Sequence, residues 1–166
     1  MKKIISKILV VLALALIVIQ FIRPVKNQSS AASENDISTV YPMPEDVKLI
    51  LAKACNDCHS NNTIYPWYNN IQPIAWWIQN HVKDGKRHLN FNEFAGYRVA
   101  RQYKKLEECV ELIKEDEMPL ESYTWIHRNA VLTKNEKNKV MDWCDTIRSI
   151  IKSKYPPDSL IMPKRR

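Results

Sequence analysis

The chain has 166 residues, of which 45% are hydrophobic, enough for one domain with a buried core. Only two glycines are present, which excludes a glycine-rich phosphate-binding loop and favours helices over hairpins. Of the net charge of +7, residues 1–26 carry +5 and residues 152–166 carry +4, which leaves −2 for residues 27–151. This near-neutral centre, without a basic face rich in aromatic residues, argues against nucleic acid as a partner.

The first 24 residues have the pattern of a targeting segment. Three lysines give it a positive start, and residues 8–22 are apolar except for Gln20. The apolar stretch is close to the length that crosses a bilayer, and it also suits the apolar region of a signal peptide. Because no small-x-small cleavage pattern follows directly, we expect an uncleaved signal anchor over residues 1–24, with the rest of the chain outside the cytoplasm.

Residues 25–42 are mainly polar and small, which predicts a flexible linker. Pro44 suits the first turn of a helix, and apolar residues then recur at helical spacing as far as Ala54. We therefore expect a first helix that runs from about Pro44 into the next motif. The folded domain is expected over residues 43–155, followed by a basic tail over residues 156–166.

The motif that follows is Cys55-Asn56-Asp57-Cys58-His59, the attachment pattern of a c-type haem. Two thiols three positions apart lie on one side of a helical turn, where they can bond to the two vinyl groups of one porphyrin. His59 then offers an imidazole nitrogen to the iron. Shuffled chains of this composition would contain the pattern in roughly two cases per thousand.

Three other interpretations of the cysteines remain open. A thioredoxin-like redox pair needs a βαβ context, and the sequence shows none. A zinc site fits poorly, because Cys58 and His59 are adjacent whereas zinc ligands are typically two or more residues apart. Cys55 and Cys58 could also be ordinary buried or disulfide-bonded cysteines. Covalent haem explains the complete pattern best.

The remaining elements are also helical in pattern. Helices are predicted over residues 71–82 and 91–115, with a turn at Gly85 and a possible break near Gly96 or Tyr103.

Thr133 and Glu136 form a capping box, and the apolar residues behind it recur at spacings of three and four. This pattern predicts an amphipathic helix that ends before Tyr155.

A haem iron has a second axial position, and Met118 is the predicted ligand there. Its thioether is a soft ligand that raises the reduction potential, and Pro119 fixes the backbone just after it. The alternative role for Met118 is ordinary apolar packing. The competing ligands are other histidines and a methionine of the tail: His81, which is the best placed, His88, His127 and Met162.

The motif, the Met118-Pro119 dipeptide and the capped C-terminal helix together resemble class I cytochromes c. Residues 54–143 resemble a bacterial family of haem-binding domain proteins with a Cys-x-x-Cys-His motif. The resemblance implies an all-α, cytochrome c-like domain with one covalent haem c, exported and usually tethered to the membrane, but it implies no reaction. The matching residues are Cys55 to Ser60, Tyr65 to Tyr68, Pro73, Trp77, His81, Gly85, Leu89 to Phe91, Glu117 to Pro119, Tyr123, His127, Leu132, Thr133 and Trp143.

Two further cysteines, Cys109 and Cys144, are not part of this pattern. Each lies on the apolar side of a predicted helix. In an oxidising compartment they could form a disulfide between these two helices, and the alternative is a pair of buried free thiols.

The sequence therefore predicts a single-haem domain on the periplasmic face of the inner membrane. Cys55 and Cys58 hold the porphyrin, and His59 and Met118 bind the iron. Six-coordinate iron with these ligands changes valence with little rearrangement, which favours electron transfer over enzymatic catalysis and implies a redox protein or membrane electron carrier as partner. The alternatives are a haem sensor or peroxidase-like protein with a labile distal ligand, and an interaction domain held by zinc or a disulfide.

Overall fold

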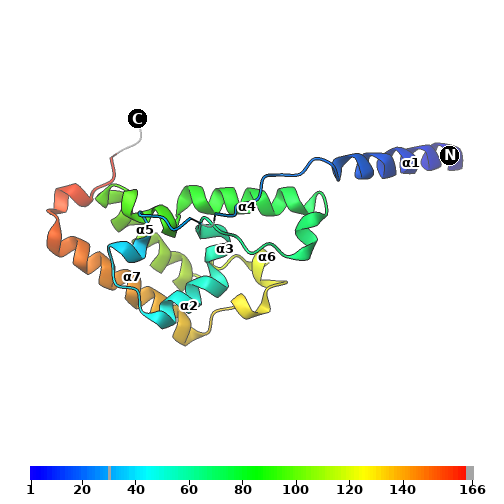
Figure 1. Ribbon diagram of the computed structural model, residues 1–166. Coiled ribbons are helices and arrows are strands. Elements are labelled where there is room, and N and C mark those ends of the chain that lie inside the picture. The colour runs from blue at the N-terminus through cyan, green and yellow to red at the C-terminus, as the bar shows by residue number, and fades with distance from the viewer. Residues whose placement is uncertain (30, 164–166) are drawn as a thin grey trace.

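A computed structural model describes residues 1–29 and 31–163, so the end of the predicted basic tail, residues 164–166, lies outside the described residues. Within those ranges the chain forms helices and no β-strand, which confirms the all-α prediction (Figure 1). The α-helices are α1 (Lys2–Ile19), α2 (Glu45–Ala54), α3 (Asn56–His59), α4 (Ile74–His88), α5 (Val99–Lys114), α6 (Glu121–Thr124) and α7 (Lys134–Lys154). Short 3₁₀ helices are η1 (Ile37–Thr39), η2 (Trp67–Asn70), η3 (Phe91–Gly96), η4 (Arg128–Ala130) and η5 (Pro157–Leu160).

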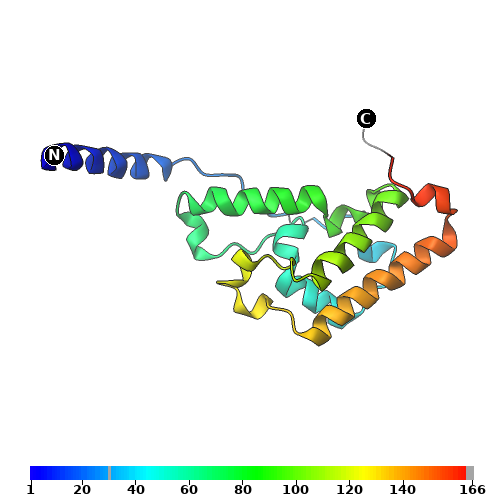
Figure 2. The ribbon, with the colours of Figure 1, turned by 180° about the vertical axis from the view of Figure 1, so that it is seen from behind.

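Helix α1 extends away from the other helices, as both ribbon views show (Figures 1 and 2). None of its residues is buried, and its first two turns carry three lysines. Among the described residues, no helix combines the length and the apolar character needed to cross a membrane, so the anchor expected over residues 1–24 is not found.

The segment predicted as a flexible linker, residues 25–42, contacts the domain at several of its described residues. The Asn27 side chain donates to the Ser60 carbonyl (3.0 Å), and the Thr63 amide donates to the Asn27 carbonyl (2.9 Å). Further along, Ile37 is completely buried, and the Tyr41 hydroxyl donates to Gln102 Oε1 (2.7 Å). The polar composition suggested a tether, but these polar groups have partners on the domain.

The helices lie where the sequence predicts them, with two differences: the first helix ends at Ala54 and does not run into the motif, and the helix expected over residues 71–82 spans Ile74–His88 and passes through Gly85. The first helix begins after Pro44, and the chain breaks between η3 and α5, close to the expected break at Gly96. Gly85 was expected to form a turn, but α4 continues through it to His88. The reason is tertiary, because α4 packs against α3 at this glycine.

The capping box at the start of α7 is confirmed. Thr133 Oγ1 accepts from the Glu136 amide (3.3 Å), and Glu136 Oε2 accepts from the Thr133 amide (2.9 Å).

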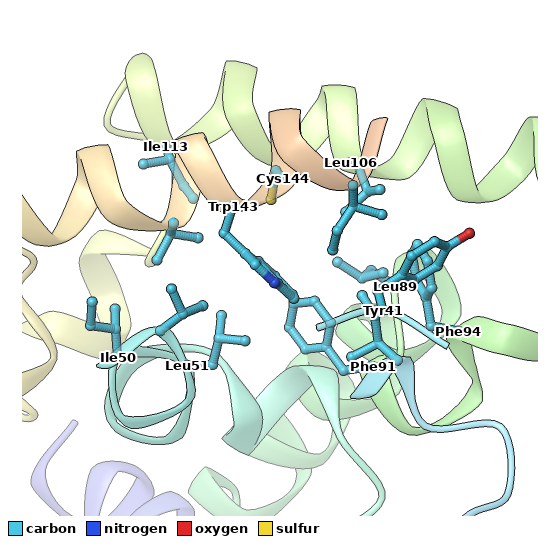
Figure 3. Packing of buried hydrophobic residues seen from close by; sticks show 14 of the residues in the cluster. Tyr41, Ile50, Leu51, Leu89, Phe91, Phe94, Leu106, Ile113, Trp143 and Cys144 are labelled. Carbon is cyan, nitrogen blue, oxygen red and sulfur yellow. The ribbon is translucent and has the colours of Figure 1, made fainter. Parts of the chain in front are cut away.

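The core lies between α5, α7 and α2 (Figure 3). Leu106 of α5 and Ile147 of α7 are fully buried, and burial of each such side chain contributes about 1.5–3 kcal/mol. Trp143 reaches across the core, where its indole N–H donates to the Pro42 carbonyl (3.0 Å) and its ring lies near Phe91. This packing leaves a cavity between the core and the α3–α4 pair.

Candidate functional site

The cavity has a volume of about 430 Å³, within the range of about 300–1,000 Å³ for ligand and cofactor pockets. It gathers all four residues predicted to hold haem: Cys55, Cys58, His59 and Met118. The competing ligand His81 also lines it.

Among the other competing ligands, His88 lines the cavity, whereas His127 lines a neighbouring one. Met162 is in the lining of neither and is 45% exposed. The candidates for the second axial position that line this cavity are therefore Met118, His81 and His88.

The cysteine motif is positioned by a break between two helices. Helix α2 ends at Ala54, and Cys55 leaves helical geometry with φ of −126° before α3 begins at Asn56. The Cys55 carbonyl accepts from the amides of Cys58 (3.1 Å) and His59 (2.9 Å). This single turn sets the two thiols on the same cavity wall, as the haem motif requires.

Helix α4 supports this turn through Gly85. A Cβ atom on Gly85 would lie 2.6 Å from the Cys58 carbonyl oxygen and 2.9 Å from the Cys58 Cβ. Both distances are shorter than any normal contact, so only glycine allows α4 to approach the motif so closely.

His59 is oriented by the residue that follows α4. Its Nδ1–H donates to the Leu89 carbonyl oxygen (2.9 Å), and because a carbonyl can only accept, Nε2 carries the lone pair. Burial is the main cause that lowers the pKa of His59, and it favours the neutral ring. A neutral imidazole with a free Nε2 is the form that binds iron.

Met118 is positioned by the way α5 ends. Asp116 has φ of +62°, the Glu117 amide donates to the Leu112 carbonyl (2.9 Å), and the Asp116 amide donates to the Ile113 carbonyl (3.4 Å). This pair of bonds is a Schellman motif. The Met118 amide also donates to the Leu112 carbonyl (3.2 Å), so Met118 is fixed to the end of α5.

The motif thiols are partly buried, and their pKa values are raised, not lowered. Burial raises the pKa of Cys55 to about 12, with Cys109 and Cys58 adding to the shift, and raises the pKa of Cys58 to about 11. A redox-active pair needs a lowered pKa, so the thioredoxin-like alternative has no support here. Within residues 1–29 and 31–163, no group of three His, Cys, Asp or Glu side chains is arranged to hold a metal ion, so the zinc alternative lacks a ligand set.

Cys109 and Cys144 lie together on the cavity wall. All four cysteines are free thiols, and a hydrogen bond to Cys109 is the largest cause that raises the pKa of Cys144. The two thiols are therefore neighbours, and the disulfide between them stays a prediction.

Asp57 and Tyr123 join the motif to α6, a contact that the sequence did not predict. The Tyr123 hydroxyl donates to Asp57 Oδ2 (2.8 Å), and the Ile64 amide donates to Asp57 Oδ1 (2.9 Å). These partners are 66 and 7 residues from Asp57, so no helical or strand periodicity could have revealed the first contact.

The lining fits a flat apolar ring system. Two thiols and an imidazole line the cavity, and the rest of the lining is mostly aliphatic and aromatic, with Leu51, Leu112, Ile113, Leu132, Val140 and Trp143. Lys105 also lines the cavity, where it forms an ion pair with Glu108. The donor set and the apolar space both suit haem.

Comparison with models of known families finds a haem-binding domain over residues 14–146, a range that includes the cysteine motif and Met118. No curated protein and no solved structure matches the chain.

Proposed function

The chain belongs to the haem-binding domain family, and from that premise we propose that it carries one covalent haem c and transfers single electrons. The observation that supports this most is the single cavity lined by Cys55, Cys58, His59 and Met118. Cys55 and Cys58 would hold the porphyrin by thioether bonds, and His59 Nε2 would bind one face of the iron. The bound haem supplies a one-electron change of valence, and the apolar lining keeps water away from it.

Met118 is the proposed second axial ligand, with His81 as the alternative. Helix α4, which carries His81, packs directly against α3 at Gly85, and Leu89 just after α4 holds His59. Helix α4 therefore supports the His59 side of the site. Met118 comes from a separate segment after α5, which favours it for the other face of the iron.

The acid groups of a haem need cationic partners, and Lys105 and His88 are the proposed ones. Both line the cavity, and both lie close enough to His59 to contribute to lowering its pKa. Lys105 is already paired with Glu108, so a haem carboxylate would share this lysine.

The proposed location is the periplasmic face of the inner membrane. The N-terminal segment, in which lysines precede an apolar stretch, would act as the signal or anchor. The prediction is that the full chain, expressed in a bacterium, fractionates with the inner membrane and is digested by protease added to spheroplasts. Recovery of an undigested chain in the cytosol would contradict it.

The experiment that tests the haem proposal is an absorption spectrum of the chain exported from a host that matures c-type haem. The oxidised, reduced and carbon monoxide-treated states are compared, and haem retention is checked on a denaturing gel. We expect covalent haem that is low-spin in both states and unaffected by carbon monoxide. Carbon monoxide binding would instead indicate a sensor or peroxidase-like protein, and a colourless folded protein would overturn the haem proposal.

The ligand assignment is tested with three matched variants, Met118→Ala, His81→Ala and Met162→Ala. Only Met118→Ala should become high-spin and bind carbon monoxide, with a lower reduction potential, because it removes the thioether ligand. If His81→Ala alone has this effect, His81 is the ligand.

We also propose that Cys109 and Cys144 form a disulfide after export, with a periplasmic dithiol oxidase accepting the two electrons. Thiol titration of the haem-loaded chain, denatured without reductant, should find no reactive thiol. Two reactive thiols would rule out the disulfide.

A further inference from the structure

A second cavity of about 280 Å³, here called the side pocket, lies beside the haem cavity between α4, α6 and the loop that leads into η2. The two cavities share wall residues, among them Asp57, Cys58, His81 and Tyr123. An occupant of the side pocket would therefore lie one side chain away from the haem attachment site. The volume is just below the range for drug-sized ligands, so the occupant is small.

The lining of the side pocket selects an uncharged occupant. No lysine or arginine among the described residues lines it. Its one carboxylate, Asp57, already accepts from Tyr123 at Oδ2 and from the Ile64 amide at Oδ1. An anion would find no lysine or arginine to pair with, and both Asp57 oxygens are already held by hydrogen bonds, so the mostly apolar lining favours an uncharged ligand over a charged one.

Two polar side chains of the pocket select a hydroxyl group on that occupant. The His127 Nδ1–H donates to the Tyr123 carbonyl (3.1 Å), which leaves the lone pair on Nε2. The Tyr68 hydroxyl therefore donates to His127 Nε2 (3.3 Å), and its oxygen keeps lone pairs that can accept a further hydrogen bond. A ligand O–H can fill that role, and the Tyr123 and His127 rings, stacked at 4.2 Å, form a flat aromatic wall beside it.

The rim of the side pocket is apolar and open to solvent. Ile64 is 76% exposed, Trp77 48% and Ile126 63%, although all three line the pocket. The segment that follows α1 is fastened to α4, since the Trp76 indole N–H donates to the Ile22 carbonyl (3.0 Å). Exposed apolar groups around a small pocket favour a ligand that enters from an apolar phase.

We propose that the side pocket binds a small, uncharged hydroxyaromatic ring of the quinol class, which donates electrons to the haem site. Each quinol gives up two electrons and two protons and leaves as the quinone; two ferric haems each accept one electron and become ferrous, and the two protons pass to solvent water. The donor role rests on the proposed haem function, whereas binding of the ring does not.

Binding is tested on the full, haem-loaded chain with 2,3,5,6-tetramethylphenol, which has one hydroxyl and is not a quinol. Its methyl ether, which lacks the O–H donor, is the matched probe, and calorimetry gives both affinities. The phenol should bind about five- to tenfold more tightly than the ether, the value of one hydrogen bond. Equal affinities, or no binding of either probe, would overturn the proposal.

Two variants assign that binding to the side pocket. Tyr68→Phe combined with His127→Phe removes the hydroxyl and also the Nε2 lone pair that its loss would free, and should abolish the preference for the phenol. The matched Tyr155→Phe, on an exposed tyrosine at the end of α7, should keep the preference. Ile74→Trp, at a half-exposed lining position, should weaken both probes by filling the pocket. An undiminished preference in the double variant would place the site elsewhere.

The donor role is tested with tetramethyl-1,4-hydroquinone under anaerobic conditions, because its fully substituted ring does not add to thiols after oxidation. One equivalent should reduce two equivalents of ferric haem, and Ile74→Trp should slow the reduction in proportion to its weaker binding. Binding of the phenol without haem reduction would overturn the donor role. A chain that binds the phenol but carries no haem would contradict the proposed function and leave the binding site in place.

Discussion

The two sides of the haem cavity are held in different ways. On the motif side, His59 is fixed by the buried Leu89 carbonyl and by the close approach of α4 at Gly85. On the methionine side, Met118 is fixed by the cap of α5 and by an ion pair between Lys137 and the exposed Asp116 side chain. Buried contacts open only when much of the domain unfolds, whereas surface contacts open locally. The comparison indicates a rigid histidine side and a more adaptable methionine side.

The largest expected effect comes from removing the aromatic ring behind His59. Phe91 is 6% exposed and lies edge-on to His59, with ring centroids 6.3 Å apart. Phe91→Ala should lower the free energy of unfolding by about 3–5 kcal/mol, because it leaves a cavity in the core. Urea unfolding of the haem-loaded protein measures this loss. The control is Trp67→Ala at a 76%-exposed position, which should lower the free energy of unfolding by less than about 0.5 kcal/mol. A loss of similar size in both variants would contradict a rigid motif side.

The next largest effect is expected at Gly85. Gly85→Ala places a methyl group against the Cys58 backbone, at an overpacking cost of about 1–3 kcal/mol or more. The gain in helix propensity, about 1 kcal/mol, offsets only part of it. We expect a lower melting temperature and less haem attachment. Gly96→Ala is the matched control, because its new methyl group would meet only the Asn35 side chain at 3.4 Å. Normal haem attachment in Gly85→Ala would argue against close packing there.

On the methionine side, the backbone at Asp116 gives a smaller effect. Asp116 has a φ of +62°, a conformation that alanine disfavours. Asp116→Ala also removes the ion pair with Lys137, and together these changes should lower the free energy of unfolding by about 1 kcal/mol. Asp116→Gly also removes the pair but adopts this conformation freely, and should stay within about 0.5 kcal/mol of the parent. Thermal unfolding compares the two. Equal losses would show that the ion pair, not the cap, holds Met118 in place.

The smallest effect is expected at the contact that joins the two sides. Lys53 of α2 donates to Glu136 at the start of α7 (2.6 Å), and this hydrogen bond is the main cause that lowers the Glu136 pKa to about 2. Because the folded pKa is depressed, the stabilisation is present above the unfolded value of about 4.3 and is lost as the pH falls through about 2. Glu136→Gln should therefore cost about 1 kcal/mol or less at pH 7. Unfolding measured from pH 7 to pH 2 should show this difference shrinking, and a constant difference would contradict the assignment.

The sequence alone predicted the features whose physics is local. The Cys55 to His59 turn, the Thr133 capping box and the break near Gly96 each depend on bonds within about four residues, so their residue types and spacing can be recognised directly. The family model supports the coarser prediction, a haem-binding domain.

Only the tertiary structure brought Met118 and His81 to the cavity of His59 and decided that Gly85 lies inside a helix rather than in a turn. It also placed Asn27 and Tyr41 against the domain and formed the side pocket around Tyr68 and His127. These contacts join residues tens of positions apart, and they exist only because the helices pack around one core. No periodicity in the chain encodes them, since side-chain patterns report which face of an element is buried and not what it is buried against.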